Sequence, residues 1–245
     1  MQTERMQVGW RTELDRSDLN DLQDATGISN QRTLNMLHTR LTARMKGDNF
    51  ARFQSWFSLG VSAGELWFRD TTADLGDATY ANTQGHFHKL QLSAGHVQSL
   101  SPHVFASLSL QGQWSDTNLD ASQKMSFGGA QNVRAYRPGV LSGDNGQWMR
   151  MEITRQFMVE PTVNQFQGLI AASLFLESAW LQVYRKPWSS ITDNQAKLSG
   201  AGTSLSWQGP NHWSANLSVS RALGKTPSLL SDSSPKHNGV WLDIV

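Results

Sequence analysis

Apolar and polar residues alternate strictly over long segments of this chain. In 212–221, Trp213, Ala215, Leu217 and Val219 alternate with serine and asparagine. A period of two predicts β-strands whose two faces meet different surroundings. Segments of the same kind run near 4–14, 31–45, 49–63, 86–99, 104–114, 147–157, 168–181, 197–208 and 238–245.

The length of these segments distinguishes them from the strands of soluble sheets. They extend over about 10–14 residues, whereas soluble strands usually have about 5–6 and tilted membrane strands need roughly 9–11. Their apolar faces often end in tryptophan, as in an interfacial aromatic girdle. The tryptophans in question are Trp10, Trp114, Trp180, Trp207 and Trp213.

Composition supports a water-filled interior. The chain has 28 Ser and 19 Gln, which together outnumber its 21 Lys+Arg and 20 Asp+Glu. A net charge of +1 gives no general electrostatic case for binding nucleic acid. The absence of cysteine excludes disulfides, thiolate zinc sites and cysteine nucleophiles.

The connections between the segments alternate in length. Short links at 46–48, 100–102 and 209–211 alternate with long ones at 15–30, 64–85, 118–146, 182–196 and 222–237, and the link at 158–166 is intermediate. Outer-membrane barrels have short periplasmic turns and long extracellular loops. We therefore predict an all-β, antiparallel transmembrane β-barrel of about ten strands, with both chain ends on the periplasmic side.

Helical membrane segments and export signals are not expected. The longest mostly apolar run, 169–176, is far shorter than the ~20 residues of a membrane helix. The first residues, 1–6, also lack the apolar stretch of a signal peptide.

The longest polar link carries the motif on which a resemblance rests. It contains Ser126-Phe127-Gly128-Gly129, then Val133-Arg134-Ala135-Tyr136, then Gly143-Asp144-Asn145-Gly146 before a strand with Glu152. This order resembles the haemolysin secretion/activation (ShlB/FhaC/HecB) family of two-partner secretion transporters. The resemblance covers most of 86–245, including Gly200-Ala201-Gly202 at a late strand.

The resemblance implies that 118–146 is a long loop folded back into the barrel lumen. It also implies that the loop arginine, Arg134, pairs with an acid in a Phe-x-Asp-x-Gly pattern on a neighbouring strand. Here that stretch is Phe175-Leu176-Glu177-Ser178-Ala179, so glutamate replaces aspartate. We expect a bidentate Arg134–Glu177 pair to hold the loop. The other loop-motif residues are Gly128, Gly129, Val133, Ala135, Tyr136, Gly143, Asp144 and Gly146.

The alternation independently predicts where Glu177 points. Glu177 is in register with Ser173 and Phe175, whereas the opposite face carries the more apolar Leu174 and Leu176. A charge on the lipid face could cost several kcal/mol at mid-membrane. Glu177 should therefore face the lumen. We expect Tyr136 to pack the loop tip against the lumen wall, and the glycines to permit tight turns.

The function that the resemblance implies is secretion and activation of a large partner exoprotein, a haemolysin or adhesin, through an outer-membrane pore. The partners would be the unfolded exoprotein and outer-membrane lipid, with basic loop residues as candidates for contact with lipopolysaccharide. Against the family pattern, residues 1–245 correspond to the C-terminal part of a roughly sixteen-stranded barrel. We therefore expect a fragment or truncated product without the periplasmic recognition domains and without an export signal.

Three alternatives remain open on the residues alone: a passive porin, an outer-membrane barrel enzyme and a soluble ligand-binding β-barrel. An enzyme is not favoured, because no Gly-x-Ser-x-Gly elbow or other recognisable catalytic motif is present. His86 and His88 share a strand face, yet their spacing suggests no third metal ligand. We predict no catalytic residues, no metal and no cofactor.

Overall fold

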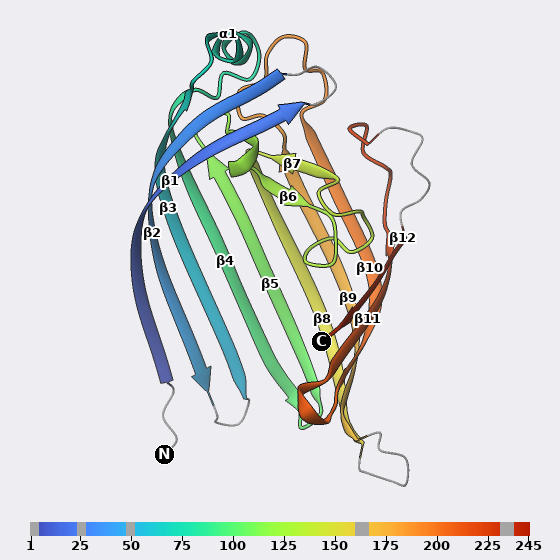
Figure 1. Cartoon of the computed structure of the whole chain (residues 1–245). Coiled ribbons are helices and arrows are strands. Elements are labelled where there is room, and N and C mark those ends of the chain that lie inside the picture. Colours follow the sequence, from blue (N-terminus) through green and yellow to red (C-terminus); the bar gives the residue numbers. More distant parts are fainter. Residues whose placement is uncertain (1–4, 24–27, 48–51, 160–166, 231–237) are drawn as a thin grey trace.

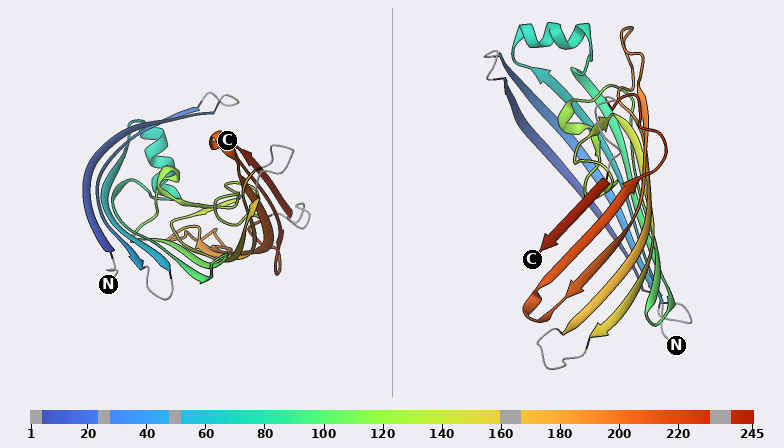
Figure 2. Two further views of the ribbon diagram at one scale, coloured as in Figure 1. Left: turned by 90° about the horizontal axis from the view of Figure 1, so that it is seen from below. Right: turned by 90° about the vertical axis from the view of Figure 1, so that its right-hand side faces the viewer.

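The computed structural model describes residues 5–23, 28–47, 52–159, 167–230 and 238–245. Ten strands form one antiparallel sheet in the order β1-β2-β3-β4-β5-β8-β9-β10-β11-β12, which follows the chain. The sheet curls around a central space with both ends of the chain at its two edges (Figures 1 and 2). The predicted all-β antiparallel architecture is therefore confirmed.

The strands are long, as the alternation predicts. The first five are β1 (Arg5–Gln23), β2 (Ile28–Gly47), β3 (Phe53–Phe68), β4 (Gly85–Ser101) and β5 (Val104–Ser115). The remaining strands of the large sheet are β8 (Asn145–Val159), β9 (Gly168–Gln182), β10 (Gln195–Gln208), β11 (Ser214–Ala222) and β12 (Asn238–Ile244).

The predicted long link at 15–30 is wrong. β1 and β2 continue their antiparallel pairing beyond the amphipathic segments, as far as Gln23 opposite Ile28. Backbone pairing does not depend on alternation, so the ladder extends into a polar stretch that the pattern could not recognise as strand. Much of the predicted intermediate link, 160–166, and part of the long link at 222–237 lie outside the described residues.

Among the described residues, helical structure occurs only in short pieces outside the sheet. α1 (Thr71–Thr79) follows β3, whereas the 3-10 turns η1 (Ala121–Gln123) and η2 (Pro210–His212) lie in connections. In the part of the chain that is described, no helix is long and apolar enough to span a membrane.

The two faces of the sheet differ as the sequence indicates. On β9, Leu174 and Leu176 are 69% and 55% exposed on the outer face, whereas Phe175 and Glu177 are both 3% exposed. Cross-strand register carries this alternation from strand to strand, because paired residues share a face. The outer face is therefore apolar, and the inner face is polar except where the loop packs on it.

Candidate functional site: the inward loop and its anchors

The connection from β5 to β8 folds back into the space enclosed by the sheet (Figure 2). Within it, β6 (Met125–Phe127) and β7 (Leu141–Gly143) pair as a small separate sheet. The connection predicted at 118–146 is thus a hairpin in which residues 128–140 join β6 to β7, and β8 already begins at Asn145. We call residues 127–136 the loop tip and residues 118–124 the loop stem.

Asp144 fixes the base of this hairpin. Its carboxylate is fully buried and lies 2.9 Å from Lys124 Nζ. The carboxylate also accepts hydrogen bonds from the backbone amides of Leu119 at 3.1 Å and Arg185 at 2.8 Å. One side chain therefore joins the two legs of the hairpin to the β9–β10 connection, and charge-assisted bonds of this kind are stronger than neutral ones.

The turn at the tip depends on glycine and asparagine. Gly128 has φ +93°, and a Cβ there would lie 2.1 Å from the Arg137 carbonyl oxygen. Asn132 Oδ1 accepts hydrogen bonds from the amides of Gly128 at 2.6 Å and Val133 at 2.7 Å. Since L side chains rarely adopt this φ, the glycine at 128 is required by the backbone.

Apolar side chains attach the loop tip to the wall formed by β8, β9 and β10. Phe127 and Val133 are fully buried, Ala135 and Tyr136 nearly so. They pack in one cluster with wall residues Trp148, Ala179, Leu181, Ala196 and Leu198, together with Leu230. Gly146 on β8 leaves the space that the Phe127 ring occupies, because a Cβ there would lie 2.5 Å from it. Tyr136 packs against this inner wall.

A buried cluster of charges lies beside these apolar contacts. Glu177 Oε2 accepts a hydrogen bond from the Arg134 backbone amide at 2.8 Å, and Oε1 accepts one from Arg150 Nε at 2.7 Å. Arg134 Nε lies 3.4 Å from the same Oε1, and its Nη2 lies 3.7 Å from Glu152 Oε2. Two arginines and two glutamates therefore balance in charge, with Glu177 at the centre (the anchoring cluster).

Other groups complete the surroundings of Arg134. Its guanidinium carbon lies 4.0 Å from the centre of the Phe175 ring, a cation–π contact. Its backbone oxygen accepts a hydrogen bond from Trp241 Nε1 on β12 at 2.8 Å. Burial lowers the pKa of Arg134, the nearby Arg150 lowers it further, and Glu177 and Glu152 raise it. An arginine nonetheless stays cationic in a protein.

The structure brings Arg134 and Glu177 together, but the contact differs from the bidentate pair that we expected. Arg150 takes the more direct position on Glu177, and its Nη2 also donates to the Asn132 carbonyl at 3.1 Å. Arg134 Nη1 is buried without a hydrogen-bond partner in the described part of the chain. Because the Arg134 backbone amide occupies Glu177 Oε2, the two guanidinium groups share Oε1, and neither forms a bidentate pair with the carboxylate.

Arg150, Glu152 and Trp241 were not predicted as members of this site. Arg150 and Glu152 alternate with Met149 and Met151, so the parity that placed Glu177 inside would also have placed them there. Trp241 gives no such signal, since its contact depends on how far the sheet curls.

The loop stem has an anchor of its own on the other side of the curl. Leu119 is 1% exposed and packs with Leu34, Leu66 and Phe87 of β2, β3 and β4. Beside it, Asp120 Oδ2 lies 3.2 Å from Arg32 Nε. The loop therefore contacts two separate parts of the inner wall, and sequence analysis did not identify this second attachment.

The paired histidines lie apart from the loop tip. His88 Nδ1 lies 2.7 Å from Asp116 Oδ2, and His86 Nε2 lies 3.4 Å from Glu65 Oε1. Among the described residues, no group of three or more histidine, aspartate or glutamate side chains could hold a metal ion.

The fold and the inward loop define a β-barrel protein whose lumen contains a folded-back connection. A family model, "Haemolysin secretion/activation protein ShlB/FhaC/HecB", matches residues 2–172. The chain belongs to this family, as the loop motif indicated.

Individual relatives agree with this assignment. The heme/hemopexin transporter protein HuxB of Haemophilus influenzae (strain 86-028NP) is 24% identical over 249 residues, which cover 100% of this chain and 42% of HuxB. The outer membrane transporter CdiB of Escherichia coli O6:K15:H31 (strain 536 / UPEC) is 31% identical over 121 residues, 49% of this chain and 19% of CdiB. The chain thus spans less than half the length of these relatives.

A solved structure supports the fold. CdiB from Escherichia coli superposes with a TM-score of 0.55 at 18% identity, covering 98% of this chain and 50% of that one.

Proposed function

We propose that this protein contributes to an outer-membrane pore that secretes and activates a large partner exoprotein, a haemolysin or adhesin, by two-partner secretion. It acts as a conduit and not as an enzyme. Its apolar outer face contacts outer-membrane lipid, and basic residues of its long connections contact lipopolysaccharide. Residues 1–245 supply C-terminal strands of the barrel.

The observation that carries this proposal is the loop that lies inside the curl on a buried charge cluster. A loop in this place narrows the path through the barrel and must move for a polypeptide to pass. The loop tip is held by hydrogen bonds and ion pairs among Glu177, Arg134 and Arg150, which break when these groups move apart. A permanent plug could rely on apolar packing alone. Arg134 and Glu177 are therefore the proposed pair that sets whether the path is closed.

The polar inner face supports passage of an unfolded chain. Inward positions of β4 and β5, such as Gln91, Ser93, Gln111 and Gln113, carry amides and hydroxyls. These groups offer hydrogen bonds to a polypeptide in transit without retaining it strongly. Because the exoprotein folds outside the cell, transport needs no nucleotide-binding site.

Secretion of a co-expressed candidate exoprotein tests the proposal. With residues 1–245 placed in a complete transporter of this family, the wild-type sequence should release the exoprotein into the medium, and Arg134→Ala should abolish most of that release. Arg137→Ala is the matched control, since Arg137 lies three residues away with an exposed side chain. A wild-type protein that conducts ions but releases no exoprotein would identify a passive porin and overturn the proposal. Undiminished release by Arg134→Ala would overturn the role of the pair.

A further inference from the structure

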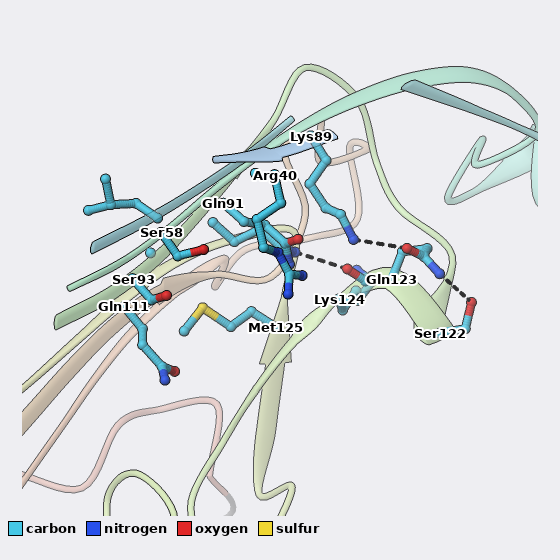
Figure 3. A pocket seen from close by; sticks show the side chains of 14 residues that line it. Arg40, Ser58, Lys89, Gln91, Ser93, Gln111, Ser122, Gln123, Lys124 and Met125 are labelled. Carbon is cyan, nitrogen blue, oxygen red and sulfur yellow. Dashed lines mark hydrogen bonds between the residues drawn. The ribbon is translucent and has the colours of Figure 1, made fainter. Parts of the chain in front are cut away.

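A row of cations lies on the inner face of the first two strands. On β2, alternate side chains face inward, and Arg40 lines the cavity between the sheet and the loop stem (Figure 3). Arg44 and Lys46 share the face of Arg40, because they follow it by four and six residues along the strand. The intervening Leu41 points outward and is 42% exposed.

The register of β1 against β2 places further cations directly opposite this row. In the backbone register, Arg11 lies directly opposite Arg40, and Arg5 lies directly opposite Lys46. Like charges in directly opposed positions destabilise an antiparallel pair. Arg11 is compensated by Glu13, at 3.0 Å. In the described part of the chain, no acidic side chain forms an ion pair with the other members of the row, which are Arg5, Arg40, Arg44 and Lys46.

The positive character continues into the cavity of about 370 Å³ beside the loop. Lys89, on β4, is 7% exposed and donates a hydrogen bond to Gln123 Oε1 at 2.9 Å (Figure 3). Serine and glutamine supply most of the remaining lining, and no acidic side chain contributes to it. The cavity and the row therefore form one surface that attracts anions.

The opposite wall lacks this character. Inward positions of β10 and β11 carry Ser204, Ser206, Asn216 and Ser218, which pair across the two strands. The acids on the inner face of β1, which are Glu13, Asp15 and Asp21, all lie between Arg11 and the β1–β2 turn. An anionic chain that enters from the end where Arg5 lies would therefore meet cations on one side and hydroxyls or amides on the other.

We propose that the row Arg5, Arg40, Arg44 and Lys46 binds acidic side chains of a polypeptide as it enters the pore, an inference that rests on the proposed function. Same-face residues of a strand repeat about every 7 Å, as do alternate carboxylates of an extended peptide. The row from position 40 to position 46 thus spans roughly 20 Å. Cations spaced along a line suit a chain that carries several carboxylates. One small anion would instead need cations that surround a single point.

Peptide binding to the detergent-solubilised protein tests this without requiring secretion. The probe is a labelled peptide of alternating glutamate and serine, compared with a peptide that has glutamine in place of glutamate, and fluorescence anisotropy reports affinity. Wild type should prefer the glutamate peptide, and Arg40→Gln/Arg44→Gln/Lys46→Gln should weaken its binding about tenfold or more. Arg40→Lys/Arg44→Lys should retain the preference, as should Lys197→Gln, which removes a cation from the outer face of β10.

The outcomes of the peptide-binding experiment distinguish the acidic-peptide surface from other roles of the row. Equal affinity of wild type for both peptides, or an unchanged preference in the triple variant, overturns the proposal. A triple variant that changes only the chloride selectivity of the pore also overturns it, because the row would then act on small ions. Circular dichroism confirms that each variant retains its strands. If the peptide preference holds but no exoprotein is released, the proposed function fails while the acidic-peptide surface stands.

Discussion

The loop tip and the loop stem attach to the same barrel by different physical means. The tip contacts the β8–β9 wall through a buried cluster of carboxylate and guanidinium groups, with an apolar cluster beside it. The stem contacts β2, β3 and β4 mainly through Leu119, with the Arg32–Asp120 pair at its edge. Both anchors exclude water, but only the tip places a charge at its centre.

The two anchors should therefore respond differently to perturbation. A buried ion pair contributes little net stability compared with apolar residues of similar shape, yet breaking it costs much. An apolar contact loses stability in proportion to the volume removed. We therefore expect the tip to switch sharply between attached and released, and the stem to weaken gradually.

The largest expected effect is that of Glu177→Gln. The neutral amide would leave Arg134 and Arg150 buried without their central anion, at a cost of about 3–5 kcal/mol. Limited proteolysis of the folded protein should show much faster cleavage within 128–140. Glu13→Gln is the control, because Glu13 also pairs with an arginine but its side chain is 53% exposed. Equal cleavage in Glu177→Gln and wild type would contradict a charge-dependent tip.

Leu119→Ala should come next, since it removes a fully packed side chain from the stem. We expect a loss of about 2–4 kcal/mol in the free energy of unfolding, measured by denaturant titration in detergent. Leu75→Ala on α1 should change little, because Leu75 is 65% exposed. Proteolysis near the stem should increase without release of the tip. Simultaneous release of both would show that the anchors act as one unit.

Gly128→Ala should have a smaller effect, confined to the turn. Its positive φ and the approach of the Arg137 carbonyl predict strain of about 1–3 kcal/mol. The same measurement on Gly76→Ala gives the contrast, because a Cβ at Gly76 meets nothing within 4 Å. A Gly128→Ala variant as stable as wild type would show that the tip turn adapts.

The smallest effect concerns the contact between Asp116 and His88, away from both anchors. Burial raises the pKa of the Asp116 carboxyl, but hydrogen bonds from the backbone amide and ring of His88 lower it by more. A lowered folded-state pKa contributes stability above the ordinary value of 3.8, which is lost as the pH falls through the folded value. The free energy of unfolding, measured above and below this pH, should therefore fall slightly more on acidification in the wild type than in Asp116→Asn.

Much of the tip could be predicted from sequence, because its information is local. Alternation alone placed Glu177 on the inner face, and the loop motif identified Arg134. The same alternation also places Arg150 on the inner face. It does not predict which carboxylate on the next strand Arg150 contacts. The sharing of Glu177 between two arginines therefore required the register of β8 against β9.

The stem could not be predicted from sequence, because its partners are distant in the chain. Leu119 contacts residues of β2, β3 and β4 only because the sheet curls and the loop turns inward. The polar ends of β1 and β2 were not predicted as strand for a related reason. Residues 15–23 lack clear alternation, and their strand conformation comes from backbone pairing with β2.

Asp144 has a mechanical consequence. Because its carboxylate joins Leu119, Lys124 and Arg185 at the foot of the β6–β7 hairpin, the two legs cannot separate while those bonds persist. Any displacement of Arg134 and its neighbours is then a rotation of a paired arm about a fixed pivot. Under the proposed function, the length of the arm therefore limits how far the tip can travel, and the moving hairpin stays attached to the barrel at Asp144.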